Sequence, residues 1–333
     1  LIRILSVIIS AGTVYLTYRL ALVIRPGHSL LAIGSASILA FTPMFVFISG
    51  SINNDNLAML IASATILIAS NGRNIDKHKV NIGFTFGRNY YPIAGRISIL
   101  HVLLGVLLGL GALTKLSLLT LFPIVGLSIS YNKALHWWND PNRKYFKACI
   151  SYALLLTFQL VVIFGTAIAI SGWWFLRNLR LYGSLTGINM FVEVLGQRSH
   201  SAPLAQLWSE RIGFMQSYWG LFGAVNVPLP QWVYATLNTL SILSIVGLIM
   251  LIVRKLKESG WQKKQWFPLA LNVVFICVVI VSLIRWATDT WSSQGRLVFT
   301  AIQSITVLFA LGIYSVVPSN FYKVRPFVII SLS

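Results

Sequence analysis

Long apolar runs separated by short polar segments dominate this sequence of 333 residues from end to end. A helix needs roughly 20 apolar residues to cross the hydrocarbon of a bilayer. Backbone polar groups find no partner there, and these runs are too long and too continuous for the strands of a barrel, so the spans must be helices. We place nine complete spans at 1–24, 29–49, 52–70, 97–113, 116–130, 147–170, 232–253, 267–284 and 297–317, and part of a tenth from 324. The predicted fold is all-α, a polytopic transmembrane helical bundle.

Charge supports this class and orients the chain. Only 10% of the residues are charged and 56% are hydrophobic, whereas soluble domains carry about 25% charged residues. The net charge of +19 would by itself suit a nucleic-acid partner. Its basic residues instead gather between the apolar runs, as the positive-inside rule describes, so we expect no nucleic-acid partner.

Placing segments 19–28, 71–96, 132–147, 254–264 and 318–325 in the cytoplasm gives that side 18 Lys and Arg and three acids, a balance of +15. The other side has eight Lys and Arg and four acids, a balance of +4. We therefore expect a multipass membrane protein, in contact with membrane lipids, with Leu1 outside.

The predicted organisation is a single multipass domain over 1–333 with one long outer loop at 171–231. Loops of that length are usually functional, and residues 204–222 could form an amphipathic helix along the membrane interface. The chain starts at Leu1 and stops within an apolar run, which suggests an internal piece of a longer protein.

The sharpest polar motif is the turn at 49–56, which carries Asn53, Asn54 and Asp55 between two apolar helices. A carboxylate there could hold a divalent cation or act as a base toward a sugar hydroxyl. Asn and Asp are also the favoured residues for capping a helix, so capping alone is the alternative.

A second motif at 172–183 carries Trp173, Arg177 and Arg180 at the outer end of a span. On a helix the two arginines share a face, and guanidinium groups bind phosphate in a bidentate manner. Anchoring at the membrane interface by Trp and Arg is the alternative.

Two further outer motifs complete the set. Segment 217–230 holds Trp219 and Asn226 in a loop rich in glycine and proline, whose aromatic faces could stack on a sugar or simply pack against the bilayer. Segment 292–296 holds Gln294 and Arg296 at the start of the last complete span.

Lys115 stands alone between two apolar runs. Charges at membrane depth are costly, so Lys115 and Arg296 are candidate phosphate ligands. Snorkelling to the headgroups is the alternative for Lys115. The five histidines are scattered, and the sequence has no Walker, GxGxxG or nucleophile-elbow motif, which argues against nucleotide hydrolysis.

The order of these motifs resembles a bacterial family of predicted membrane glycosyltransferases, domain of unknown function 2142. The resemblance rests on Arg3-Ile-Leu-Ser, the Asn53-Asn-Asp turn, Gly111-Ala-Leu-Thr-Lys-Leu-Ser, Gly172-Trp-Trp-Phe-Leu-Arg-Asn with Leu181-Tyr-Gly, Trp219-Gly-Leu-Phe-Gly and Gln294-Gly-Arg. It covers nearly the whole chain, although each motif is short. That family is similar in plan to the GT-C superfamily, which includes protein mannosyltransferases and lipid A aminoarabinose transferases.

The resemblance implies a GT-C-like fold and an inverting enzyme that takes a sugar from a polyprenyl-phosphate donor at the outer face of a bacterial cytoplasmic membrane. It implies that Asp55 binds the acceptor or a divalent metal such as Mg²⁺ or Mn²⁺, and that Lys115, Arg177, Arg180 and Arg296 bind the donor phosphate. The principal catalytic carboxylate of GT-C proteins lies in an earlier outer loop, which we expect upstream of Leu1.

Two other functions remain open. A transporter or flippase for a lipid-linked or anionic solute would need charges near the bilayer midplane and broken helices. A non-catalytic subunit of a membrane complex would need only packing surfaces and an anchoring loop.

Overall fold

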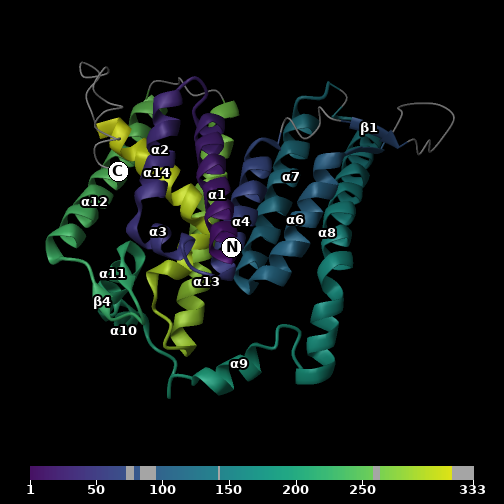
Figure 1. The fold of residues 1–333 in the computed structure, drawn as a ribbon. Coiled ribbons are helices and arrows are strands. Elements are labelled where there is room, and N and C mark those ends of the chain that lie inside the picture. The colour runs from purple at the N-terminus through teal and green to yellow at the C-terminus, as the bar shows by residue number, and fades with distance from the viewer. Residues whose placement is uncertain (73–78, 83–94, 142, 258–262, 317–333) are drawn as a thin grey trace. The chain divides into compact units, whose positions relative to one another are not determined.

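The structure is a computed structural model that describes residues 1–72, 79–82, 95–141, 143–257 and 263–316 (Figure 1). Its chain forms two compact units, and each is described by itself. Unit 1 comprises Leu1–Ser63 and Ile188–Ser333, and unit 2 comprises Ala64–Gly187. The tenth span predicted from 324 lies outside the described residues.

Unit 1 consists almost entirely of helices in its described part. They are α1 (Ile2–Ile24), α2 (Ser29–Phe41), α3 (Pro43–Ser49), the first turns of α4 (Asn54–Ser70), α9 (Ile188–Leu195), α10 (Leu204–Ser209), α11 (Arg211–Trp219), α12 (Gln231–Lys257), α13 (Lys263–Asp289), the 3-10 helix η2 (Gly295–Ala301) and α14 (Ile302–Val316). Two short strands, β3 (Leu221–Phe222) and β4 (Val227–Pro228), pair antiparallel.

Unit 2 contains the rest of α4, then α6 (Ile99–Thr114), the 3-10 helix η1 (Leu116–Thr120), α7 (Leu121–Trp138) and α8 (Phe146–Tyr182). Between α4 and α6, strands β1 (Lys79–Ile82) and β2 (Gly95–Ser98) pair antiparallel, with Lys79 opposite Ser98.

Six helices of the described chain are long and apolar enough to cross a membrane: Ile2–Ile24, Leu116–Trp138, Ala148–Tyr182, Gln231–Lys257, Trp266–Asp289 and Gly295–Val316. The multipass helical architecture predicted from the apolar runs is therefore present. Helices α4 and α6 lie where spans were predicted but are shorter apolar helices.

The run at 29–49 forms two helices, α2 and α3, bent by 66° to one another. The bend falls at Thr42, whose ψ of 117° is extended, followed by Pro43. Proline disfavours helical backbone in the residue before it, which explains the break. If the bent pair counts as one span, the number rises to seven.

Helix α8 is much longer than the span predicted at 147–170. It has 37 residues, which at 1.5 Å per residue is about 55 Å, well beyond the roughly 30 Å of a bilayer core. Residues 171–182, predicted as the beginning of the outer loop, are its last turns. The helix stops at Gly183, whose φ of 65° is left-handed and suits glycine.

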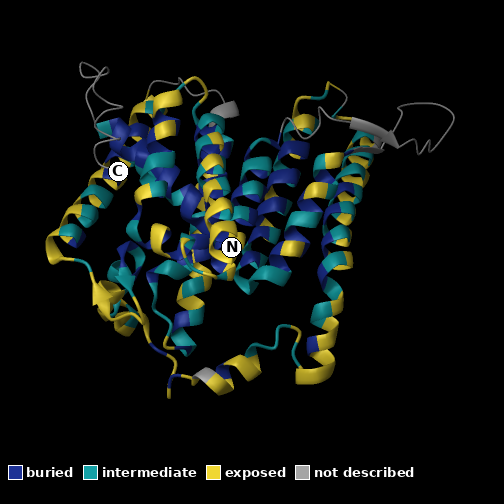
Figure 2. Cartoon of the chain, viewed as in Figure 1, coloured by how far each residue is buried: buried dark blue, intermediate teal, exposed yellow. Residues whose placement is uncertain are grey.

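Helix α14 forms the centre of unit 1 and is buried along its length, as Figure 2 shows. It packs on α12 with almost no side chain between them, because a Cβ at Gly247 would lie 2.0 Å from the carbonyl oxygen of Gly312. The hydroxyl of Ser244 donates to the carbonyl of Phe309 at 2.9 Å. Small residues allow such close approach of membrane helices.

Helix α1 has its hydroxyls inside and its apolar side chains outside. Ser6, Ser10, Thr13 and Thr17 are buried, while Ile4, Leu5 and Ile8 are exposed. This inversion of the pattern of a soluble helix is expected where lipid surrounds the protein, because lipid solvates apolar side chains well.

Candidate functional site

In unit 2, glycines set the register between α6 and α8. A Cβ at Gly105 would lie 2.5 Å from the carbonyl oxygen of Ile163, and one at Gly109 would lie 2.8 Å from Cβ of Ile170. Both contacts advance along the two helices in the same direction, so α6 and α8 run parallel. The spacing Gly105-x-x-x-Gly109 is that of close-packed membrane helices.

This register brings Lys115 and Arg177 to the same end of the helix pair. Lys115 is the C-cap residue of α6. It follows Gly109, which contacts Ala167 and Ile170, by six residues, so in the parallel pair it lies level with residues 173–176 of α8. Arg177 follows Ile170 by seven residues and therefore lies on the same face of α8, toward α6. Arg177 and Arg180 are exposed and share a side of the helix, as predicted.

Asn178, between these arginines, was missed by the sequence analysis. It is only 2% exposed, and among the described residues its Nδ2 has no hydrogen-bond partner. A buried donor without a partner costs about 1–3 kcal/mol. Asn178 follows the buried residues Ala167 and Ser171 by eleven and seven positions, so it lies on the same buried face of α8. That spacing is the sequence signal that could have identified it.

In unit 1, the turn before α4 assigns different roles to neighbouring polar residues. The Oδ1 atom of Asn53 accepts from the backbone N–H of Asp55 at 3.0 Å, so Asn53 provides the cap. Asp55 sits in the first turn of α4 and is 8% exposed. Asn54 is exposed.

Asn56 fixes this turn to the bundle. Its Nδ2 donates to the carbonyls of Ile48 at 3.0 Å and Ser51 at 3.1 Å. Its Oδ1 accepts from the hydroxyl of Ser10 at 3.2 Å. The position of Asp55 is therefore held by bonds to α1 and α3.

Asp55 is the one carboxylate of the turn at 49–56. Across the part of the chain that the structure describes, no three His, Cys, Asp or Glu side chains come together as metal ligands. A Mg²⁺ ion commonly uses one or two carboxylates and completes its shell with water and substrate phosphate. Asp55 can therefore supply one carboxylate ligand to such an ion, with water and substrate phosphate completing the shell.

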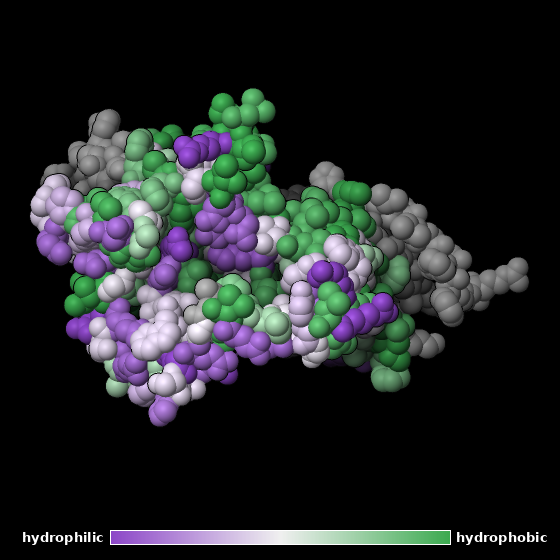
Figure 3. All heavy atoms as spheres, turned by 60° about the horizontal axis from the view of Figure 1, so that its bottom comes forward, coloured by the Kyte–Doolittle hydropathy of each residue, from purple (hydrophilic) through white to green (hydrophobic). Residues whose placement is uncertain are grey.

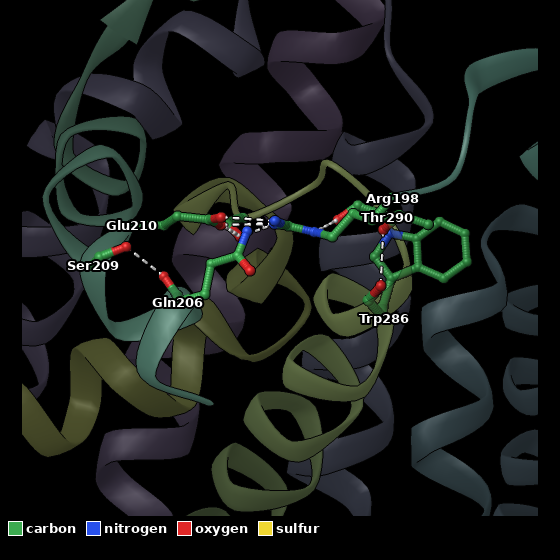
Figure 4. A network of polar contacts seen from close by, with 7 residues as sticks. Arg198, Gln206, Ser209, Glu210, Trp286 and Thr290 are labelled. Carbon is green, nitrogen blue, oxygen red and sulfur yellow. Dashed lines mark hydrogen bonds and ion pairs between the residues drawn. The ribbon is translucent and has the colours of Figure 1, made fainter. Parts of the chain in front are cut away.

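Arg198, also unrecognised in the sequence, joins three segments of unit 1 (Figure 4). Its guanidinium binds both carboxylate oxygens of Glu210 at 2.8 Å. Its Nε donates to the carbonyl of Thr290 at 3.0 Å, and it stacks over Trp291 at 4.4 Å from the ring centroid. The Arg198 side chain is 2% exposed and that of Glu210 is 26% exposed.

The hydrogen bonds from Arg198 and Ser293 hold the pKa of the Glu210 carboxyl below its usual range. Backbone bonds reinforce the connection, since the N–H of Arg198 donates to the carbonyl of Asp289 at 3.0 Å and that of Ala202 to Thr288 at 2.7 Å. The segment after α9 is thereby tied to the end of α13.

The segment 292–296 packs against α11. The backbone N–H of Gly295 donates to the hydroxyl of Ser217 at 2.7 Å, and a Cβ at Gly295 would lie 2.2 Å from the carbonyl oxygen of Phe214. Only glycine fits there. Arg296, half-buried, donates through Nε to Oε1 of Gln294 at 2.9 Å.

The aromatic candidates differ in exposure. Trp219 is 5% exposed, and its indole N–H donates to Asn238 at 3.0 Å, so it packs within unit 1. Trp173 on α8 is 60% exposed. Asn226 is exposed, and its Oδ1 accepts from the backbone N–H of Ala224 at 3.2 Å.

The predicted amphipathic segment 204–222 forms α10, α11 and β3, with Leu204 and Trp208 exposed. Figure 3, which brings the α10 and α11 end of unit 1 forward, shows hydrophilic residues beside hydrophobic ones there. Such a mixed surface suits the polar boundary of a membrane.

The candidate residues fall into two groups. Lys115, Arg177 and Arg180 belong to unit 2, whereas Asp55, Gln294 and Arg296 belong to unit 1. Fold and sites together define a multipass helical protein with cationic and amide groups at the ends of its helices. Comparisons with family models, with curated proteins and with solved structures found no match.

Proposed function

We propose that this chain belongs to a membrane glycosyltransferase that transfers a sugar from a polyprenyl-phosphate donor to an acceptor at the outer face of the membrane. The observation that carries the proposal is the placement of Lys115 and Arg177 at one end and on one side of the parallel α6/α8 pair. The resemblance of its sequence motifs, in their order, to those of the predicted membrane glycosyltransferases supports it.

The proposed chemistry assigns each group a simple task. The acceptor oxygen attacks the anomeric carbon, the bond to the donor phosphate breaks, and the phosphate leaves with the electron pair. Lys115 and Arg177, joined by Arg180, stabilise the charge that develops on that phosphate. Asp55 binds the acceptor or a divalent metal, and its carboxylate takes the proton of the acceptor.

The test is sugar transfer from a radiolabelled polyprenyl-phosphate donor by the full-length protein. We expect Lys115→Met, Arg177→Met and Asp55→Ala each to lower transfer at least about tenfold, since each removes a charged contact to substrate. Arg254→Met, in the last turn of α12, is the matched control because Arg254 lies in a predicted cytoplasmic segment. Transfer unchanged in all three variants would refute the assignment.

A second candidate function is movement of a lipid-linked or anionic solute across the membrane. It is favoured by the 66° break between α2 and α3, because broken helices often mark the binding sites of transporters. The interior of unit 1 also holds Gln303, fully buried, with neither amide atom bonded to any described residue.

Gln303 faces α1 and α2. It precedes Tyr314 by eleven residues and so shares a face of α14 with it, and Tyr314 contacts His28 and Arg25 of the α1–α2 turn. Exchange of a fluorescent polyprenyl-phosphate analogue between the leaflets of proteoliposomes tests this function. Exchange by the wild type that Gln303→Leu abolishes, without any sugar transfer, would favour the transporter.

A further inference from the structure

We propose that Asn178 is a hydrogen-bond donor to the phosphoryl oxygens of an anionic ligand, in a site at the α6–η1–α7 corner that it forms with Lys115 and Arg177. The inference deepens the proposed function and rests on it for the nature of the ligand, a phosphate group. It adds a neutral, buried member to a site otherwise made of cations.

The direction of the Asn178 side chain follows from its neighbours on α8. Helix α6 meets the face of Ile163 and Ile170, and α7 meets the face of Phe164, whose ring stacks on Phe122 at 5.8 Å. At 100° per residue, Asn178 lies between these two faces. It therefore points toward the corner where η1 joins α6 to α7.

Register places Lys115 at the same corner. Lys115 is the residue at which the chain leaves α6 for η1, and it lies level with residues 173–176 of α8. Asn178 is less than two turns further along. Both residues therefore border the end of the α6/α8 pair, with Arg177 on the α6 side.

The chain after α8 covers Asn178 from the opposite side. The helix ends at Gly183, and Gly187, with φ of 65°, brings its backbone back over α8. A Cβ at Gly187 would lie 3.3 Å from the Tyr182 ring and 3.8 Å from Nδ2 of Asn178. The turn at Gly187 therefore lies close to the amide of Asn178, whose residue is 2% exposed.

The chemistry of the unbonded atom selects the ligand. Nδ2 carries two N–H donors and requires an acceptor oxygen. Lys115 and Arg177 bring an ammonium and a guanidinium group to the same end of the helix pair. Together with the amide donors they favour an anion with several oxygens, as in phosphate. Burial strengthens such hydrogen bonds because the surroundings have a low dielectric constant.

A purely structural role for Asn178 makes the opposite prediction about one substitution. If the amide only occupies space, Asn178→Leu replaces an unbonded donor by an apolar group of similar size and should leave ligand binding unchanged. If the amide binds phosphate, the same variant loses affinity although the protein remains as stable as the wild type or more so.

The experiment measures binding of two probes to the detergent-solubilised protein by microscale thermophoresis, inorganic phosphate and farnesyl phosphate. We expect Asn178→Leu to weaken binding about tenfold to a hundredfold, as for loss of a hydrogen bond to a charged group. Asn178→Asp should weaken it further, because a carboxylate repels the anion. Asn272→Leu is the matched control, since Asn272 is fully buried but bonded to Pro268 and Ser304.

The outcomes separate the inference from the proposed function. Binding of both probes indicates a site for free phosphate, and binding of farnesyl phosphate alone indicates a lipid-linked phosphate; either supports the inference if Asn178→Leu weakens it. Sugar transfer absent in the wild type would refute the glycosyltransferase but not this site. Equal phosphate affinity of the wild type and a stable Asn178→Leu, or no binding by the wild type, would overturn the inference.

Discussion

Arg198 connects three segments of unit 1 through one guanidinium group. It binds Glu210 with two hydrogen bonds and the carbonyl of Thr290 with a third. Removing one partner of a buried ion pair leaves the other charge poorly solvated, which costs about 3 kcal/mol. We therefore expect Arg198→Met to lower the melting temperature clearly in thermal unfolding of the detergent-solubilised protein.

The matched control is Arg285→Met. Arg285 pairs with Asp289 one turn away, but the two side chains are 73% and 42% exposed, and exposed pairs contribute little. The melting temperature of Arg285→Met should stay close to that of the wild type. Equal losses in both variants would contradict the structural role assigned to Arg198.

The same ion pair predicts how stability depends on pH. Its hydrogen bonds lower the pKa of Glu210 in the folded protein, so the unfolded chain binds the proton more readily than the folded one. The stabilisation that the ionised Glu210 provides is therefore fully present above the ordinary pKa of about 4.3. It is lost as the pH falls through the lower pKa that Glu210 has in the folded protein.

We expect the melting temperatures of the wild type and Glu210→Gln to differ at pH 7 and to converge as pH falls below about 4. The difference between the two curves isolates Glu210 from the other carboxylates. A gap that stays constant from pH 7 to pH 3 would show that the charge of Glu210 is not responsible.

At the scale of elements, the α6/α8 contact depends on glycines that leave no room for a side chain. A Cβ at Gly105 would lie 2.5 Å from the backbone oxygen of Ile163, which cannot move aside without shifting α8. We expect Gly105→Ala to destabilise the protein by about 1–3 kcal/mol, as overpacking does. Thermal unfolding and, for the proposed site, phosphate affinity should both decline.

Gly165→Ala provides the comparison on the partner helix. A Cβ there would meet nothing within 4 Å, and alanine favours helix more than glycine does. Its melting temperature should be unchanged or slightly raised. A destabilised Gly165→Ala would mean that α8 tolerates no substitution in general, and the register argument would lose its support.

The elements were predictable wherever apolar runs alone determine them. Helices α1, α12, α13 and α14 lie within a few residues of the predicted spans, because length and hydropathy are sufficient evidence for a helix in lipid. The end of α8 was not predictable in that way. Its last turns carry Arg177 and Arg180 outside the apolar run, and the helix continues until Gly183 stops it.

The candidate sites were less predictable than the elements. Asn53, Asp55 and Lys115 were proposed as site residues because each interrupts an apolar run. Arg198 and Glu210 were not, because their partnership spans twelve residues of irregular chain and depends on how that chain folds back to Thr290. Asn178 was overlooked beside two charged neighbours, since burial rather than residue type makes its amide notable.

At the scale of the whole molecule, the orientation in the membrane decides which chemistry is available. The positive-inside rule places Lys144 in the cytoplasm and Ser199 outside, and both side chains are exposed. We expect Ser199→Cys in intact cells to react with a membrane-impermeant maleimide, and Lys144→Cys to react only after permeabilisation. The natural Cys149 and Cys277, which are exposed thiols, would first be replaced by serine.

Labelling of Ser199→Cys in intact cells would place the loop that contains Arg198 on the outer side. The C-terminal ends of α6 and α8 would then also lie outside, because successive spans reverse direction. A polyprenyl-phosphate donor that is used outside the cell could then reach Lys115 and Arg177. The reverse pattern, with Lys144→Cys labelled in intact cells, would put the cationic site in the cytoplasm. An outward-facing transferase would then be excluded, although the phosphate site itself would still be testable by its affinity.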